Sequence, residues 1–441
     1  MQILDWTTAD AAARRAALCR PVQITQEILR RQVANIIAAV RDRGDAVLRE
    51  FTAQFDGASL TALRVAPTEI DAAVSVLDES TRFAVETAIG TLTQYHRAGQ
   101  QDGYTVETAV GVECRRLIRP IETVGLYVPG GSSPLISTVL MLAIPAMLAG
   151  CREIVLCTPP RRDGSVHPLI LSAAALCGVR NIVKIGGAQA IAAMAYGTDT
   201  VPRVDKIFGP GNAWVTAAKL LVSANADGVA CDLPAGPSEV LVIADTEANP
   251  KFVAADLLSQ AEHGPDSQVL LVSDCRELVV KVQAVIAMQL ATLPRADITR
   301  MALTASRAIV TRDLHEAVKV SNAYAPEHLI LAVCDPETLL NQVDNAGSVF
   351  LGDWSPEALG DYVSGTNHVL PTYGFARSLS GLAIQDFQKR ISVQRATREG
   401  IATLGPSAVT LAQAEGLEAH ARAIGQRLDA LREGGRHVLG A

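Results

Sequence analysis

The sequence predicts an α/β protein built on mainly parallel β-sheets. From residue 153 onward, short apolar runs at 153–158, 181–185 and 240–244 alternate with helical segments. This alternation is typical of βαβ units, in which a crossover helix joins two parallel strands. A chain of 441 residues is also too long for one ordinary core, so we expect two or more domains.

Composition argues against several classes of protein. Hydrophobic residues make up 49% of the chain and charged residues 19%, which is typical of a soluble globular protein. The net charge is −7 and there is no basic block, which argues against a nucleic-acid partner. The first twenty residues are charged and unlike a signal peptide, and the most apolar run, 135–148, is too short for a membrane span. Eight scattered cysteines without a C-x-x-C pair fit reduced thiols, so we expect a cytoplasmic protein with no membrane partner.

Helical periodicity is clear near both ends of the chain. Apolar residues at three-and-four spacing predict helices over 26–51 and 69–95, with a break at Gly44 and a new helix capped by Asp45. Near the C-terminus an apolar helical stripe runs from Leu417 to Leu431. Such a stripe on a terminal helix is usually a docking surface, and a second subunit is one candidate partner.

Three glycine turns follow predicted strands and precede predicted helices. They are Pro129-Gly130-Gly131, Gly186-Gly187 and Gly209-Pro210-Gly211. A strand that runs into such a turn and then a helix presents backbone N–H groups to an anion, as phosphate sites do. None is a G-x-G-x-x-G motif, and ordinary βα turns explain these segments equally well when they are taken alone.

Side chains suited to metal binding or proton transfer occur further along. Gln260 and His263 share one helical face just before the helix ends at Gly264-Pro265, although a surface Gln and a C-terminal His are the commoner interpretation. Glu327-His328 follow a proline, in the first turn of a helix or in a loop, and can handle protons. Residues 347–372 are rich in turns, and long segments of this kind usually carry function.

Together these stretches resemble the histidinol dehydrogenase family over roughly residues 30–427. The family carries out the NAD-dependent four-electron oxidation of L-histidinol to L-histidine through L-histidinaldehyde, at the end of histidine biosynthesis. The combination is highly specific. The matching stretches are 127–131, 187–192, 209–212, 234–240, LSQAEH at 258–263, APEH at 325–328, 352–371 and 415–420.

The resemblance implies a set of site residues and cofactors. It implies one zinc per subunit, bound by Gln260, His263, Asp361 and His420. It implies NAD contacts from Tyr127, Gln189 and Asn212, and substrate contacts from Ser238, His328, Glu415 and the four zinc ligands. His328 is then the general base, and Glu327 activates the water that adds to the aldehyde. Family members are homodimers with shared active sites, so Glu415 and His420 should enter the partner's site.

We expect two modified or incomplete Rossmann-like domains with mainly parallel sheets, together with extended N- and C-terminal arms. The expected ranges are 1–24 for an N-terminal arm, 25–130 with 239–380 for the larger domain, 131–238 for the second domain and 381–441 for a dimerising arm. The alternative function is a zinc-dependent amidohydrolase-type hydrolase, which leaves the glycine turns unexplained. A metal and nucleotide sensor would be expected to lack Glu327 or His328, and both are present.

Overall fold

The computed structural model describes residues 1–20, 26–130, 134–233 and 236–438. It divides into two compact units, Met1–Gly99 with Ile121–Phe387, and Gln100–Pro120 with Gln388–Ala441. We refer to these as the first unit and the second unit. Among the described residues, no helix is both long enough and apolar enough to cross a membrane.

The first unit contains a six-stranded parallel sheet in the order β1-β11-β10-β9-β12-β13. Leaving β1 aside, the strands follow the order 3-2-1-4-5 along the chain, as in the first five strands of a Rossmann fold. The strands are β1 (Gln2–Asp5), β9 (Glu239–Ala244), β10 (Gln268–Ser273), β11 (Arg307–Val310), β12 (His328–Ala332) and β13 (Ser348–Leu351).

Helices cover both faces of this sheet, which is why its strands are apolar throughout. Val240 and Val242 pack in one core cluster, which includes residues of α10 (Pro250–Ala261), α11 (Arg276–Leu290) and α12 (Ala296–Ala305). Leu241 and Ile243 pack in the opposite cluster, which includes residues of α1 (Ala11–Ala17), α13 (Leu314–Tyr324) and α14 (Pro336–Leu340). Strand β1 thus forms an edge of the six-stranded sheet, and α1 packs on one of its faces through Ala17.

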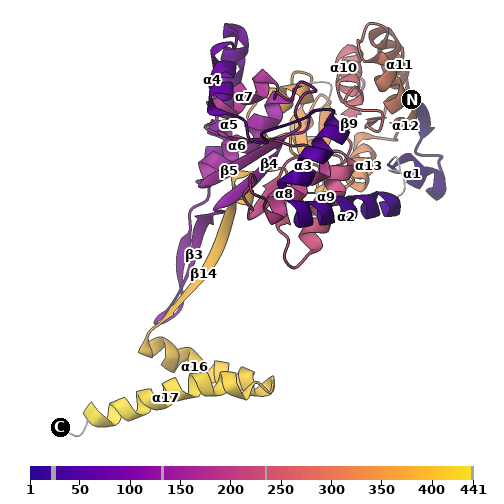
Figure 1. Cartoon of the computed structure of the whole chain (residues 1–441). Coiled ribbons are helices and arrows are strands. Elements are labelled where there is room, and N and C mark those ends of the chain that lie inside the picture. Colours follow the sequence, from indigo (N-terminus) through magenta and orange to yellow (C-terminus); the bar gives the residue numbers. More distant parts are fainter. Residues whose placement is uncertain (21–25, 131–133, 234–235, 439–441) are drawn as a thin grey trace. The chain divides into compact units, whose positions relative to one another are not determined.

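A five-stranded parallel sheet, also in the first unit, repeats this strand order as β6-β5-β4-β7-β8. The prediction of two incomplete Rossmann-like arrangements is therefore confirmed. The strands are β4 (Thr123–Tyr127), β5 (Glu153–Thr158), β6 (Asn181–Lys184), β7 (Lys206–Phe208) and β8 (Ala230–Cys231). One face is covered by α4 (Pro67–Ser75), α5 (Glu79–Ala98), α6 (Ile136–Ala149) and α7 (Pro168–Leu176). The other is covered by α2 (Gln26–Arg43), α3 (Asp45–Phe51), α8 (Gly187–Tyr196) and α9 (Ala213–Ala224) (Figure 1).

The second unit consists of an antiparallel sheet and a helical hairpin. The sheet has the order β14-β3-β2, from β2 (Tyr104–Ala109), β3 (Val112–Pro120) and β14 (Gln388–Ala396), and α16 (Arg398–Ala414) and α17 (Glu418–Val438) follow. Ile424 and Leu428 of the apolar stripe pack beside Gly405 of α16. Part of the stripe thus packs within its own chain, while Leu417 of the stripe and Leu404 and Leu411 of α16 stay exposed.

Two local predictions are wrong. Asp45 does not cap α3, because Gly44 holds the cap position and the Asp45 carboxylate instead accepts hydrogen bonds from the Thr198 hydroxyl (2.6 Å) and the Thr200 N–H (3.2 Å). His328 is in neither a helix nor a loop, since it is the first residue of strand β12. Between 347 and 372 the chain forms only β13 and the short helix α15 (Glu357–Tyr362). Both parallel sheets belong to one compact unit. The expected boundaries between a larger and a second domain therefore stay a prediction.

Candidate active site

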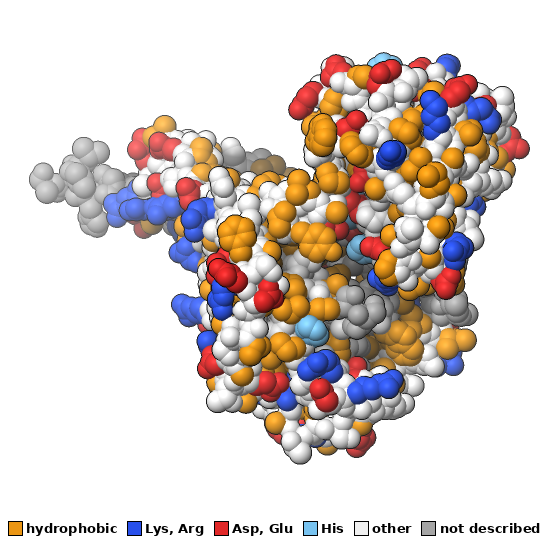
Figure 2. Space-filling view, turned by 90° about the horizontal axis from the view of Figure 1, so that it is seen from above, with side chains coloured by type: hydrophobic (Ala, Val, Ile, Leu, Met, Phe, Trp, Pro, Cys, Tyr) orange, Lys and Arg blue, Asp and Glu red, His pale blue; other side chains and the backbone are white. Residues whose placement is uncertain are grey.

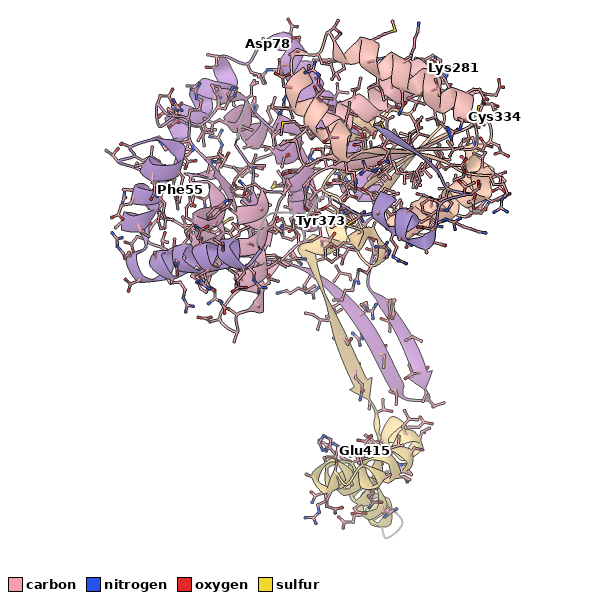
Figure 3. All side chains as sticks on the ribbon, turned by 90° about the vertical axis from the view of Figure 1, so that its right-hand side faces the viewer. Phe55, Asp78, Lys281, Cys334, Tyr373 and Glu415 are labelled. Atoms are coloured by element: carbon pink, nitrogen blue, oxygen red, sulfur yellow. The ribbon has the colours of Figure 1, made fainter. Side chains whose placement is uncertain are left out.

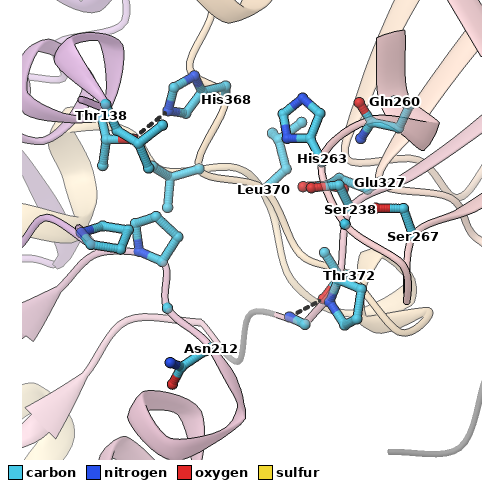
Figure 4. Close-up of a pocket in the computed structure, with 18 of the residues that line it drawn as sticks. Thr138, Asn212, Ser238, Gln260, His263, Ser267, Glu327, His368, Leu370 and Thr372 are labelled. Atoms are coloured by element: carbon cyan, nitrogen blue, oxygen red, sulfur yellow. Dashed lines mark hydrogen bonds between the residues drawn. The ribbon is translucent and has the colours of Figure 1, made fainter. Parts of the chain in front are cut away.

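A cavity of about 550 Å³ in the first unit contains most of the predicted site residues. Figure 4 shows many of its lining side chains, and Figure 2 shows a hollowed face of the molecule with histidine side chains beside it. The seven predicted residues that line it are Asn212, Ser238, Gln260, His263, Glu327, His328 and Asp361. Tyr127 and Gln189 are buried elsewhere, and Glu415 and His420 are exposed in the second unit.

The cavity combines opposite edges of the two parallel sheets. Pro129 follows β4 and Pro210 follows β7, at the carboxyl edge of the five-stranded sheet, where ligands of doubly wound folds usually bind. Ser238, Ser267 and Glu327 precede β9, β10 and β12 by one residue each, and so lie at the amino edge of the six-stranded sheet. The six-stranded sheet therefore departs from the usual rule that ligands bind at the carboxyl ends of parallel strands.

His328 is held in one tautomer and leaves its second ring nitrogen free. Its Nδ1 lies 3.0 Å from the carbonyl oxygen of Glu239. A carbonyl only accepts hydrogen bonds, so Nδ1 carries the hydrogen. Nε2 is buried without a hydrogen-bond partner among the described residues and lies 3.5 Å from Asp361 Oδ1. In the neutral ring this nitrogen has a lone pair available to accept a proton.

Glu327 is fixed by the same strand end as His328. Its Oε2 accepts a hydrogen bond from the backbone N–H of Glu239 at 2.8 Å and lies 3.6 Å from His328 Nδ1. Burial raises the pKa of Glu327 to about 8. Burial alone would lower the pKa of His328, but the nearby carboxylates of Glu327, Asp361 and Glu357 outweigh it and raise that pKa. These carboxylates keep a proton on His328 and favour a bound cation, whose positive charge would return the ring to the neutral form that a base needs.

Three of the four predicted zinc donors line this cavity. The groups around Gln260 favour the amide orientation in which Nε2 donates to Glu357 (2.9 Å) and Oε1 accepts from His328 Nδ1 (3.3 Å). The His263 ring has no hydrogen bond among the described residues, and burial lowers its pKa, so the neutral ligand form is favoured. With Asp361 these residues supply nitrogen and oxygen donors that suit zinc.

The fourth predicted donor, His420, is an exposed residue of α17 in the second unit. Within the described ranges there is accordingly no cluster of three or more His, Cys, Asp or Glu side chains that could hold a metal ion. Glu415 is the C-cap of α16, also in the second unit, and Figure 3 labels it there. By their chemistry, the three donors in the first unit fit a zinc ion.

The predicted NAD residues lie at the carboxyl edge of the five-stranded sheet. The Tyr127 hydroxyl accepts a hydrogen bond from the N–H of Gly187 at 3.0 Å, and burial raises its pKa to about 12. Gln189 is buried in the first turn of α8. Asn212 is the N-cap of α9, where its side-chain oxygen accepts from the N–H groups of residues 214 and 215. Gly131, in the first glycine turn, lies outside the described residues.

Comparison with known proteins identifies the family. Residues 19–428 match the model of the histidinol dehydrogenase family. The chain belongs to the histidinol dehydrogenase family. A histidinol dehydrogenase of Xanthomonas euvesicatoria pv. vesicatoria is 59% identical over 97% of this chain and 99% of its own length. One from Shigella dysenteriae serotype 1 is 52% identical over 98% of both chains. The crystal structure of histidinol dehydrogenase from Elizabethkingia anophelis matches with a TM-score of 0.94 and 47% identity, covering 98% of this chain and 99% of that one.

Several residues beside the site of this histidinol dehydrogenase family member were not singled out from the sequence. His368 lines the cavity, with Nδ1 3.0 Å from the Asp361 carbonyl oxygen. Glu357 is buried and accepts a hydrogen bond from the Ser259 hydroxyl at 2.8 Å. Glu239 supplies both backbone groups that hold Glu327 and His328. The sequence offered a signal for two of these residues. Glu239 stands directly before an apolar run, and Glu357 lies inside a segment rich in glycine and proline.

A buried ion pair also holds the third glycine turn. Lys219 Nζ donates to the carbonyl oxygens of Gly209 (2.9 Å) and Leu233 (3.2 Å) and pairs with Asp232, whose Oδ2 accepts the Gly209 N–H at 2.7 Å. Gly209 has a φ of +124°, and a Cβ there would lie 2.1 Å from the Tyr127 carbonyl oxygen. Only glycine fits this turn, and the ion pair holds the turn through the carbonyl oxygen and the N–H of Gly209.

We expect Lys219→Met to lower the free energy of unfolding by about 3–5 kcal/mol, because it leaves Asp232 charged and unpaired in the interior. Urea denaturation of the variant and the unchanged protein measures the difference. Lys251→Met, at an exposed position of α10, is the matched control and should change stability by less than about 0.5 kcal/mol. Equal stability of the two variants would show that the buried pair does not support the turn.

Proposed function

We propose that this chain catalyses the NAD-dependent oxidation of L-histidinol to L-histidine through L-histidinaldehyde. We further propose that it works in the cytoplasm as a homodimer with one zinc per subunit. Family membership over residues 19–428 supports the activity. The observation that carries the chemistry is the free Nε2 of His328, which is buried beside a cavity while its Nδ1–H is held by the Glu239 carbonyl oxygen.

The zinc ligands in this proposal are Gln260, His263, Asp361 and His420. When bound, zinc supplies a Lewis acid that holds substrate nitrogens and a positive charge that offsets the carboxylates around His328. Glu357 orients the Gln260 amide, because its carboxylate accepts the amide N–H. Ser238 and Glu415 complete the proposed substrate contacts, and Tyr127, Gln189 and Asn212 form the proposed NAD contacts.

In the alcohol step, His328 Nε2 accepts the hydroxyl proton of histidinol while the carbinol carbon loses a hydride to NAD. The hydrogen bond from Nδ1–H to the Glu239 carbonyl oxygen keeps the ring in one orientation for this transfer, because rotation of the ring would break it. Glu327 then activates the water that adds to the aldehyde. His328 returns its first proton to the aldehyde oxygen as the water adds, and then accepts a second proton as the hydrate loses its hydride to a second NAD.

We expect Glu327→Gln to retain much of the first oxidation and to slow the conversion of L-histidinaldehyde to L-histidine. The amide keeps a group that can accept the Glu239 N–H, but it cannot take a proton from water. Separate assays with L-histidinol and L-histidinaldehyde measure the two steps. Equal loss in both would reassign Glu327 to holding His328.

The homodimer proposal assigns Glu415 and His420 to the partner's site. Both side chains are exposed in the second unit. The helical hairpin of α16 and α17 also exposes Leu404, Leu411 and Leu417, an apolar surface on which a second copy of the chain can pack. Sharing of sites explains why three donors occur in one unit and the fourth in the other. The hydrolase alternative is not supported, because the matching relatives are dehydrogenases.

Metal analysis of freshly purified protein, combined with an NADH absorbance assay on L-histidinol, tests the proposal. We expect about one zinc per subunit and an increase in NADH that depends on both NAD and L-histidinol. Chelation should abolish turnover, and added zinc should restore it. Zinc-loaded protein that produces no NADH from L-histidinol would contradict the proposed function.

A further inference from the structure

Arg20 and Glu239 form a buried ion pair beside the candidate base. Arg20 Nε lies 2.5 Å from Glu239 Oε1, and Nη2 lies 2.8 Å from Oε2, so the pairing is bidentate. The two side chains are 14% and 3% exposed. The guanidinium also lies 3.9 Å from the centre of the Tyr324 ring. Arginine suits this place because its planar group can pair with a carboxylate and stack on a ring together.

The pair is connected to Glu327 and His328 through the backbone of Glu239. The N–H of Glu239 donates to Glu327 Oε2 at 2.8 Å, and its carbonyl oxygen accepts from His328 Nδ1 at 3.0 Å. A shift of residue 239 therefore displaces both side chains at once. Pairing with Gln268 of β10 holds the backbone at this end of β9, and Arg20 adds a second hold through the Glu239 side chain.

The same pair holds two backbone turns in an unfavourable conformation. Ala325 (φ 54°) and Tyr373 (φ 53°) are the non-glycine residues with positive φ in the described ranges. Arg20 Nη2 donates to the carbonyl oxygens of Tyr324 (3.0 Å) and Ala325 (3.2 Å), and the Tyr373 N–H donates to Glu239 Oε1 at 2.9 Å. Strain of this kind persists only where the surroundings fix the chain. The Ala325 turn leads directly into Pro326-Glu327-His328, and Figure 3 labels Tyr373.

We infer that the Arg20–Glu239 ion pair is a positioning element that sets Glu327 and His328 for proton transfer. This inference rests on the proposed function, and it gives residues of the N-terminal segment a role in turnover. Arg20 and Glu239 do not themselves line the cavity, so they act through the backbone of Glu239 and the Ala325 turn. Their loss should slow the chemical step more than it weakens binding of L-histidinol.

The test compares Arg20→Met with Arg14→Met in the full-length, zinc-loaded protein. Arg14 is a matched control, because it also donates to a backbone carbonyl, that of Trp6 (3.0 and 2.7 Å), and lies over that ring, but contacts no part of Glu239. We expect kcat of Arg20→Met to fall by about 10²-fold, the effect of misplacing a catalytic group by about 1 Å, with KM changed by less than about threefold. Arg14→Met should keep the kcat of the unchanged protein. Zinc content and thermal midpoint are measured for every variant.

Two more variants keep the inference testable if Arg20→Met does not fold. Arg20→Lys keeps the charge but loses the bidentate pairing, and Glu239→Gln keeps the shape but loses the charge, so each should lower kcat by about tenfold or more. The double variant Arg20→Lys/Glu239→Gln should be no slower than the slower single variant, because both changes break one interaction.

Several results would overturn the inference. One is an unchanged kcat in both Arg20→Lys and Glu239→Gln. Another is a rise in KM of the Arg20 and Glu239 variants without loss of kcat. The third is a loss of turnover in these variants that follows their loss of zinc. An unchanged protein that fails to turn over L-histidinol contradicts the proposed function instead. The two failures are therefore distinguishable.

Discussion

His328→Asn is expected to slow oxidation of L-histidinol by about 10²–10⁴-fold, the usual contribution of a general base. Asparagine can replace the Nδ1–H donor that the Glu239 carbonyl oxygen accepts, but it has no group that takes a proton at neutral pH. Zinc should remain bound, because His328 is not one of the proposed ligands. Steady-state kcat with saturating NAD, together with metal analysis, measures both effects.

His315→Asn is a suitable control for this substitution. His315 is exposed on α13, the helix that leads into the Ala325 turn, and its Nδ1 lies 2.6 Å from Gln342 Oε1. We expect this variant to keep its activity. Loss of zinc from His328→Asn, or kcat close to that of the control, would contradict the division between base and metal ligands.

Mixed dimers of two inactive chains should recover activity. If the second unit of each subunit completes the partner's site, a heterodimer of His263→Asn and His420→Asn chains has one site with both changes and one with neither. Activity should reappear at up to about half that of an unchanged dimer, by the symmetry of a two-fold pair. Co-expression with two different affinity tags, followed by purification of the heterodimer, provides the sample.

A second heterodimer gives the opposite expectation and serves as the control. When a chain that carries both substitutions pairs with an unchanged chain, crossing arms leave one change in each site, so this dimer should be inactive. If His420 instead serves its own subunit, the double-variant heterodimer keeps half its activity and the first heterodimer has none. The two samples together decide which subunit supplies His420.

Much of the fold could be predicted because its strands are short apolar runs separated by helices. The predicted runs 153–158 and 181–185 correspond to β5 and β6, and the predicted end of the helix near His263 corresponds to α10 with its C-cap at Glu262. His328 was misplaced because a five-residue buried strand that begins two residues after a proline looks like a helix start. The left-handed conformation of Ala325, which turns the chain into β12, has no sequence signal in an alanine.

The candidate site was less accessible to residue-by-residue reasoning. Gln260 and His263 are paired by helical spacing, but Asp361 comes to the cavity from another element about a hundred residues later, and only the family resemblance connected them. Arg20 and Glu239 are 219 positions apart, and each alone is an ordinary charged residue. Long-range pairs of this kind leave no local pattern, because packing of the whole sheet brings them together.

The most direct test of the central claim is the amount of NADH formed from a limiting quantity of L-histidinol. A dehydrogenase that completes both oxidations at one site should form two NADH for each L-histidinol consumed and release one L-histidine. The reaction is followed to its end by absorbance, with L-histidine and L-histidinaldehyde determined by chromatography. One NADH per L-histidinol with accumulating aldehyde, or consumption of substrate without NADH, would contradict the account.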